Sequence, residues 1–125
     1  MRKTLLILSF LILTAVFFAF AEETVEKPEV KESHKVTFIE IGADNCIPCR
    51  MMKPIMEEVE NEYPQVKVVF IDVMTPKGRL EATNYRVRSI PTQVFLDSLG
   101  NEYFRHVGFF PKDELVEVLK KGGVK

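Results

Sequence analysis

The sequence has no tryptophan, only two cysteines and two histidines in 125 residues, and no excess of either charge. Two cysteines cannot build a multi-disulfide scaffold. The formal net charge is −1, so no basic surface predicts nucleic-acid binding. Six glycines and seven prolines are an ordinary share, which excludes collagen-like and low-complexity chains. At this length, a single folded domain is expected.

The first 21 residues have the pattern of an export signal. Arg2 and Lys3 precede an uncharged run over residues 5–21, which ends in a small-x-small triplet directly before two glutamates. This triplet is typical of a signal peptidase site. The alternative is an uncleaved membrane anchor, because the run is close to the minimum length that crosses a hydrocarbon core of about 30 Å. Both interpretations predict an exported protein, periplasmic or otherwise extracytoplasmic, which residues 5–21 tether to the membrane if they are not cleaved.

Residues 22–35 are predicted to form a charged tether, and residues 36–125 the folded domain. The tether has five glutamates and three lysines with almost nothing to bury. Within the domain, β-branched and aromatic runs predict strands over residues 36–41, 66–73, 92–97 and 102–107. Helical periodicity predicts helices over residues 47–62, over 78–85 and from 111 to the glycines at 122–123. This order predicts a mixed α/β sheet covered by helices.

The two cysteines, Cys46 and Cys49, enclose Ile47 and Pro48 at the predicted start of a helix. Sulfurs three residues apart on the first turn lie close enough to form a disulfide. The unpaired N–H groups and the dipole of the helix favour a thiolate there, and only a thiolate attacks a disulfide. We therefore predict that Cys46 is the nucleophile and Cys49 the resolving cysteine. This redox-active pair needs no separate cofactor.

Two other interpretations of the cysteine pair involve no redox chemistry. A zinc site needs two further ligands, and the histidines, His34 and His106, lie far apart without the spacing of a zinc finger. A passive structural disulfide that closes so short a loop constrains the unfolded chain very little. We therefore expect no bound metal.

From about Val36 to Lys121, the chain resembles the thioredoxin superfamily. Residues 46–50, Cys-Ile-Pro-Cys-Arg, are similar to its active-site motif, and Pro54 stands where its active-site helix has a proline. Residues 85–92, Tyr-Arg-Val-Arg-Ser-Ile-Pro-Thr, are similar to the segment that contains its cis-proline. The resemblance implies a thioredoxin-like fold, with a central mixed sheet flanked by helices and the C-x-x-C motif at a helix N-terminus. It also implies thiol:disulfide exchange with protein substrates.

The resemblance further implies which residues bind the substrate. Pro91 is expected to be cis and to face the disulfide. Because Pro91 has no N–H, its backbone cannot donate a hydrogen bond to the sulfurs. The backbone of Ile90 can pair with an extended substrate by β-strand addition. Ile47 and Phe109 are expected to form an apolar rim; Ile41 is a third candidate for it, but burial in the core is the favoured interpretation for Ile41. The complete set of expected substrate-binding residues is Ile90, Pro91, Thr92, Ile47 and Pro48.

Glu40 lies six residues before Cys46, in an otherwise apolar strand. Members of the family have a buried carboxylate here that exchanges protons with the resolving cysteine, so the resemblance implies that Glu40 is the proton acceptor. Burial raises the pKa of a carboxyl group and makes it a usable base near neutral pH. The alternation of side chains along a strand leaves a second possibility, in which Glu40 points to solvent from an edge strand.

The sequence also departs from the family pattern. Asn45 replaces the tryptophan before the first cysteine, Ile47 replaces a glycine, and Val68 stands where a lysine near the buried acid is frequent. The tether leaves little sequence for the first strand and helix of a full thioredoxin. These differences affect the expected redox potential and the choice of partner.

Export and the family resemblance together predict a thiol:disulfide oxidoreductase outside the cytoplasm, acting as a reductant. Since cytosolic reductase and NADPH do not reach that compartment, we expect a membrane thiol-transport protein as electron donor, in disulfide interchange or cytochrome c maturation. A monomer is expected. The alternative is a non-catalytic thioredoxin-like module that binds or chaperones a secreted partner.

Overall fold

The computed structural model describes residues 34–125. The predicted signal or anchor, and all of the predicted tether up to residue 33, lie outside these described residues. Within the described part of the chain, no helix is long and apolar enough to span a membrane. The elements are β1 (Val36–Gly42), α2 (Ile47–Glu62), β2 (Val66–Asp72), α3 (Pro76–Asn84), β3 (Thr92–Asp97), β4 (Glu102–Val107) and α4 (Lys112–Lys121).

The four described strands form one mixed sheet in the order β2-β1-β3-β4. β1 runs parallel to β2, with α2 as the crossover, and antiparallel to β3. β3 and β4 form an antiparallel hairpin in which Asp97 accepts hydrogen bonds from the backbone N–H groups of Leu99 and Asn101. This arrangement confirms the predicted α/β fold. It also makes β1 an interior strand, hydrogen-bonded on both sides.

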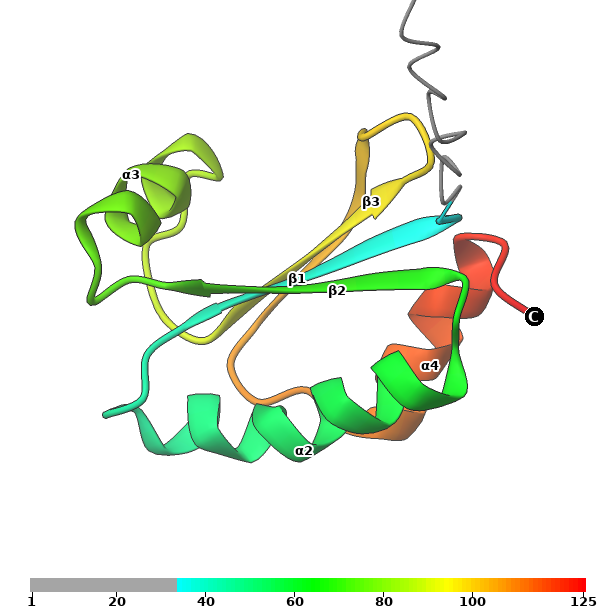
Figure 1. Ribbon diagram of the computed structural model, residues 1–125, viewed down its shortest axis with the longest axis horizontal. Coiled ribbons are helices and arrows are strands. Elements are labelled where there is room, and N and C mark those ends of the chain that lie inside the picture. The colour runs from blue at the N-terminus through cyan, green and yellow to red at the C-terminus, as the bar shows by residue number, and fades with distance from the viewer. Residues whose placement is uncertain (1–33) are drawn as a thin grey trace, which may run out of the picture. The chain divides into compact units, whose positions relative to one another are not determined.

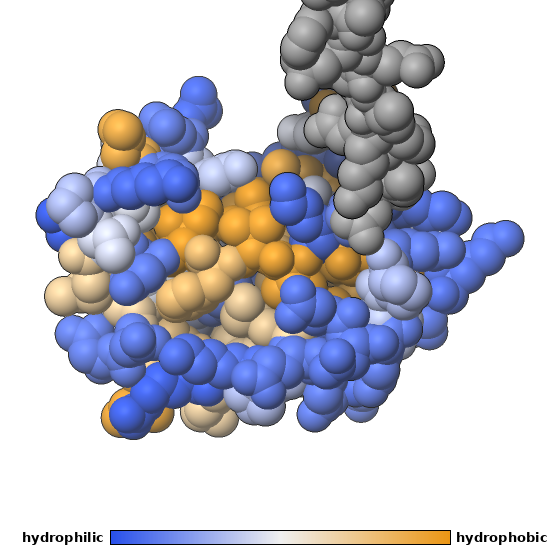
Figure 2. All heavy atoms as spheres, viewed as in Figure 1, coloured by the Kyte–Doolittle hydropathy of each residue, from blue (hydrophilic) through white to orange (hydrophobic). Residues whose placement is uncertain are grey.

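The helices cover both faces of the sheet, with α2 and α4 on one face and α3 on the other (Figure 1). The alternation of side chains along β1 follows these layers, because successive residues of a strand point to opposite faces. Phe38 belongs to the core cluster that includes Met52 and Val59 of α2, and its ring stacks on Phe95 at 5.0 Å. Ile39 and Ile41 belong to a second cluster with Ala82 of α3. Figure 2 shows apolar side chains gathered over the sheet and hydrophilic ones along α2.

Local side-chain hydrogen bonds explain two of the element boundaries that differ from the predicted ones. The helix expected over residues 78–85 begins at Pro76, since the hydroxyl of Thr75 accepts a hydrogen bond from the Gly78 N–H at 2.9 Å. The preceding strand ends at Asp72 instead of Val73, because the Asp72 carboxylate accepts from the Met74 N–H at 2.8 Å and turns the chain.

Gly78 is required by a close backbone contact. A Cβ atom at this position would overlap the carbonyl oxygen of Asp72 and lie 2.6 Å from its carbonyl carbon. Although Gly→Ala ordinarily stabilises a helix, we expect Gly78→Ala to lower the free energy of unfolding by about 1–3 kcal/mol, since β2 or α3 must shift. Urea denaturation measures this change. The exposed neighbour Lys77→Ala is the control, with an expected change within about 0.5 kcal/mol. A more stable Gly78→Ala protein would contradict the prediction.

Candidate redox active site

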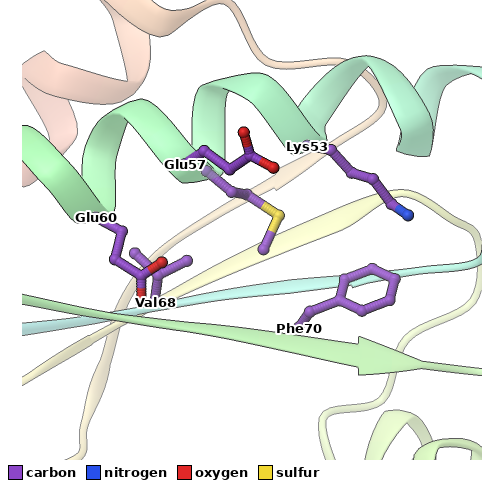
Figure 3. A pocket seen from close by; sticks show the side chains of 6 residues that line it. Lys53, Glu57, Glu60, Val68 and Phe70 are labelled. Atoms are coloured by element: carbon purple, nitrogen blue, oxygen red, sulfur yellow. The ribbon is translucent and has the colours of Figure 1, made fainter.

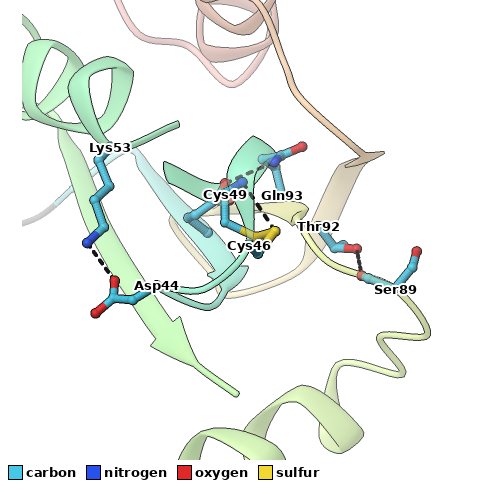
Figure 4. The surroundings of a disulfide bond; sticks show 8 residues. Asp44, Cys46, Cys49, Lys53, Ser89, Thr92 and Gln93 are labelled. Carbon is cyan, nitrogen blue, oxygen red and sulfur yellow. Dashed lines mark hydrogen bonds and ion pairs between the residues drawn. A yellow bond between two sulfur atoms is a disulfide. The ribbon is translucent and has the colours of Figure 1, made fainter. Parts of the chain in front are cut away.

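Cys46 and Cys49 form a disulfide at the N-terminus of α2, with their Cα atoms 5.2 Å apart (Figure 4). Cys46 is the N-cap residue, and its Sγ accepts a hydrogen bond from the Cys49 N–H at 3.3 Å. Pro48 lies in the first turn, where a missing N–H leaves no bond unmade. Cys46 is half-buried, whereas Cys49 is 1% exposed. Cys46 is therefore the more accessible of the two sulfurs, and the Cys49 N–H is also available to its thiolate.

The end of β1 lies directly under the buried sulfur. A Cβ atom on Gly42 would be 3.0 Å from Cys49 Sγ, so only a glycine leaves full room for this sulfur. The loop that follows β1 is held by a hydrogen bond from the Cys46 N–H to the Ala43 carbonyl oxygen. An exposed ion pair of 2.6 Å between Lys53 and Asp44 also spans it (Figure 4). The strand, the loop and the first turn of α2 thus fix the position of both sulfurs.

Glu40 is fully buried in the middle of the sheet. It lies two residues before Gly42, on the same face of β1, so its carboxyl lies on the side of the strand where Cys49 packs. The possibility that it faces solvent from an edge strand is wrong, because β1 is interior. Gln93 Nε2 donates a hydrogen bond of 2.9 Å to Glu40 Oε2. Burial raises the pKa of Glu40 to about 8, against the lowering effect of that bond.

The segment before β3 carries a cis peptide bond between Ile90 and Pro91. The Thr92 hydroxyl donates to the Ser89 carbonyl oxygen at 2.7 Å (Figure 4), and the Gly108 N–H donates to the Pro91 carbonyl oxygen at 2.8 Å. Thr92 is 2% exposed, so its side chain shapes the loop from inside. These bonds tie the cis-proline loop to the residues just before it and to the end of β4.

Comparison with known proteins agrees with this geometry. Residues 24–123 match the family described as a thioredoxin-like domain. The chain belongs to this family. Thioredoxin 1 of Synechococcus elongatus is 38% identical over 97 residues, which cover 76% of this chain and 87% of that protein. Bacillus subtilis thioredoxin is 34% identical over 104 residues, covering 82% and 97%. The structure of a mutant thioredoxin from Halobacterium salinarum superposes with a TM-score of 0.65 at 28% identity, covering 74% and 78%. With its Cys46–Cys49 pair, this thioredoxin-like protein is a thiol:disulfide oxidoreductase.

Two apolar side chains near the motif in this thioredoxin-like domain are exposed. Ile47 is 66% exposed and Phe109 is 37% exposed. Ile41 is fully buried in the core, as expected, because it points to the α3 face of the sheet. Met51 is 50% exposed, one turn after Ile47 on α2. The helix therefore presents Ile47 and Met51 together on one exposed side.

A pocket between α2 and β2 lies apart from this chemistry. Its wall combines charged side chains of α2 with Val68 and Phe70 of β2 (Figure 3). The complete lining is Lys53, Met56, Glu57, Glu60, Val68 and Phe70, which includes neither cysteine nor Glu40. The redox site is thus the exposed end of α2, not this hollow.

Two residues of the site, Gly42 and Gln93, were not predicted from the sequence. The signal for Gln93 was a polar side chain in the otherwise apolar start of a predicted strand. The sequence does not show that Gln93 binds Glu40, because the two residues are 53 positions apart and meet only through the pairing of β1 with β3. Gly42 was expected in the loop, although it closes β1 beneath the sulfur of Cys49.

Proposed function

We propose that this protein is an extracytoplasmic protein-disulfide reductase in which Cys46 attacks, Cys49 resolves and Glu40 accepts the proton of the resolving thiol. One observation carries this proposal: the two cysteines differ in exposure. Cys46 is half-buried at the helix N-cap, whereas Cys49 is buried and packs on the face of the sheet that holds the buried Glu40 carboxyl. The export pattern of residues 1–21 supports the location.

The reaction begins with the reduced site. The Cys46 thiolate attacks one sulfur of a substrate disulfide and forms a mixed disulfide, while the other substrate sulfur leaves as a thiolate. The Cys49 thiol then transfers its proton to Glu40, and its sulfur attacks Cys46 Sγ. The second substrate sulfur leaves with the bonding electron pair. Two electrons have passed to the substrate, and the site is left as the observed Cys46–Cys49 disulfide.

The substrate is a protein segment in extended conformation. The Ile90 backbone beside the cis-proline offers main-chain hydrogen bonds, which bind many sequences with similar affinity. The exposed Ile47, with Pro48 beside it in the first turn of α2, adds apolar contact near the sulfurs. Such a surface suits a disulfide in a partly unfolded or flexible protein better than a small disulfide molecule.

The oxidised site must receive two electrons for each turnover. We propose that a membrane thiol-transport protein donates these electrons, because cytosolic reductase and NADPH do not reach the extracytoplasmic side. A dithiol of that carrier would attack the Cys46–Cys49 disulfide by the same exchange chemistry in reverse. Disulfide interchange and cytochrome c maturation are processes that consume such electrons.

The redox potential tests the proposed direction. The protein is equilibrated with glutathione buffers of graded ratio, and the oxidised fraction is followed by thiol alkylation and mass spectrometry. A reductant is expected near the potential of thioredoxin, about −270 mV, while an oxidant lies closer to about −120 mV. A value near about −120 mV would contradict the reductase function. The mass of the protein after expression in a bacterium with an export pathway shows whether residues 1–21 are removed.

A further inference from the structure

Gln93 is the direct neighbour of Glu40 in the sheet. The two residues are paired in the register between β1 and β3, and both are fully buried. Gln93 also follows Pro91 by two residues, so the strand that carries it begins at the cis-proline loop. The residue paired with the buried carboxyl is thus only two positions from the cis-proline.

The pair has one hydrogen bond and two unpaired oxygens. Gln93 Nε2 donates to Glu40 Oε2 at 2.9 Å. The second oxygens, Glu40 Oε1 and Gln93 Oε1, are buried without a hydrogen-bond partner in the described part of the chain. Both are acceptors while Glu40 is ionised, and a buried acceptor without a donor is unfavourable. A proton on Glu40 Oε1 turns that oxygen into a donor for the amide oxygen, so the protonated acid and the amide complement each other.

No charged side chain competes with Gln93 for the carboxyl among residues 34–125. Lys53 of α2 binds Asp44 instead. On the far side of Gln93, β4 places His106, whose Nε2 lies 3.1 Å from a backbone carbonyl oxygen. α4 contributes apolar side chains to this face of the core. In the sheet, Glu40 is paired with Phe70 of β2 and shares its face of β1 with Phe38 and with Gly42, against which Cys49 packs.

We propose that Gln93 is a positioning residue for proton transfer: its amide holds Glu40 Oε2 and leaves Oε1 to take the Cys49 proton, which Gln93 Oε1 then binds. This inference rests on the proposed role of Glu40. As the proton reaches Oε1, the Cys49 sulfur bonds to Cys46 Sγ and the bond between Cys46 and the substrate sulfur breaks. The substrate leaves with that electron pair as a thiolate. It is protonated when Glu40 returns to its ionised form.

Gln93→Met tests the inference, because methionine has a similar length and no amide. The ionised carboxyl loses a charge-assisted hydrogen bond, which is stronger than the bonds the neutral acid loses. We expect the pKa of Glu40 to rise by about one unit, measured by ¹³C NMR titration of the glutamate carboxyl in the reduced protein. The resolving step should then slow about tenfold near pH 7 and recover at higher pH, while attack by Cys46 is unchanged.

Two comparisons separate this role from a structural or substrate-binding one. In the Glu40→Gln background, Gln93→Met should cause no further slowing, because its effect passes through the carboxyl. Val94→Ala removes buried methyl groups from the next residue of β3, on the opposite face, and so controls for lost stability. It should change neither the pKa of Glu40 nor the pH profile.

The outcomes distinguish this inference from the proposed function. An unchanged Glu40 pKa in Gln93→Met, or equal slowing in the Glu40→Gln background, would overturn the positioning role. A Glu40→Gln protein that resolves mixed disulfides at the wild-type rate would instead overturn the role of Glu40 itself. In that case the NMR titration still decides whether the Gln93 amide holds the carboxyl.

Discussion

Replacement of Cys46 by serine is expected to reduce the rate of insulin disulfide reduction to that of dithiothreitol alone. The hydroxyl of serine is a far weaker nucleophile than a thiolate toward a disulfide, and Cys49, at 1% exposure, is out of reach of the substrate. Turbidity of precipitating insulin B chain gives the rate. Serine can still act as an N-cap of α2, so circular dichroism should show an intact fold.

Cys49→Ala is the matched variant for the same pair. Attack by Cys46 should proceed, but without the resolving thiol a mixed disulfide between Cys46 and the substrate should accumulate. Non-reducing electrophoresis and peptide mass mapping identify the trapped sulfur. In the reduced wild-type protein, Cys46 should also be alkylated before Cys49 and at a pH below the ordinary thiol pKa of about 8.5. Trapping on Cys49 in Cys46→Ala would reverse the assignment of the two cysteines.

The sequence predicted the order of the strands and helices because their signals are local. The β-branched run that became β1 and the cysteine pair at the start of α2 depend on neighbouring residues only. The start of α3 was misplaced by two residues, although Thr75 and Pro76 form an N-cap signal that is visible in the sequence. Residues 77–79, one glycine between two cations, have no apolar periodicity that would mark the start of the helix.

The burial and orientation of individual side chains depended on contacts between distant segments, which no local sequence pattern reveals. Whether Glu40 faced solvent was undecided until β1 proved to be paired on both sides. β1 directs Ile41 to the α3 face, which confirms its expected burial, while Phe109 lies in the exposed loop before α4. The Gln93 amide reached Glu40 only through the pairing of distant strands. The chemistry was thus predictable from the motif, whereas the environment that tunes it was not.

Glu40→Gln is expected to change the pH dependence of stability. Burial raises the pKa of Glu40 from 4.5 to about 8, so folding takes up a proton between these values. The associated stability is fully present below pH 4.5 and is lost as pH rises through about 8. At about 1.36 kcal/mol per pKa unit, the wild-type protein loses at most roughly 5 kcal/mol over this window. Glutamine has no such titration, so the variant should be the more stable protein near about pH 9, measured by urea denaturation.

The same substitution should slow the resolving step near neutral pH by a factor on the order of 10², since general-base assistance is lost. In the wild-type protein the rate should rise with pH as Glu40 ionises around its pKa of about 8. In Glu40→Gln, this rise should be absent until the Cys49 thiol ionises unaided. Rapid-quench kinetics between about pH 6 and 9 separate attack from resolution, with Glu57→Gln on the exposed side of α2 as the charge-matched control. Identical resolution profiles for the two variants would remove Glu40 from the mechanism, and its buried carboxyl would then destabilise the fold without contributing to catalysis.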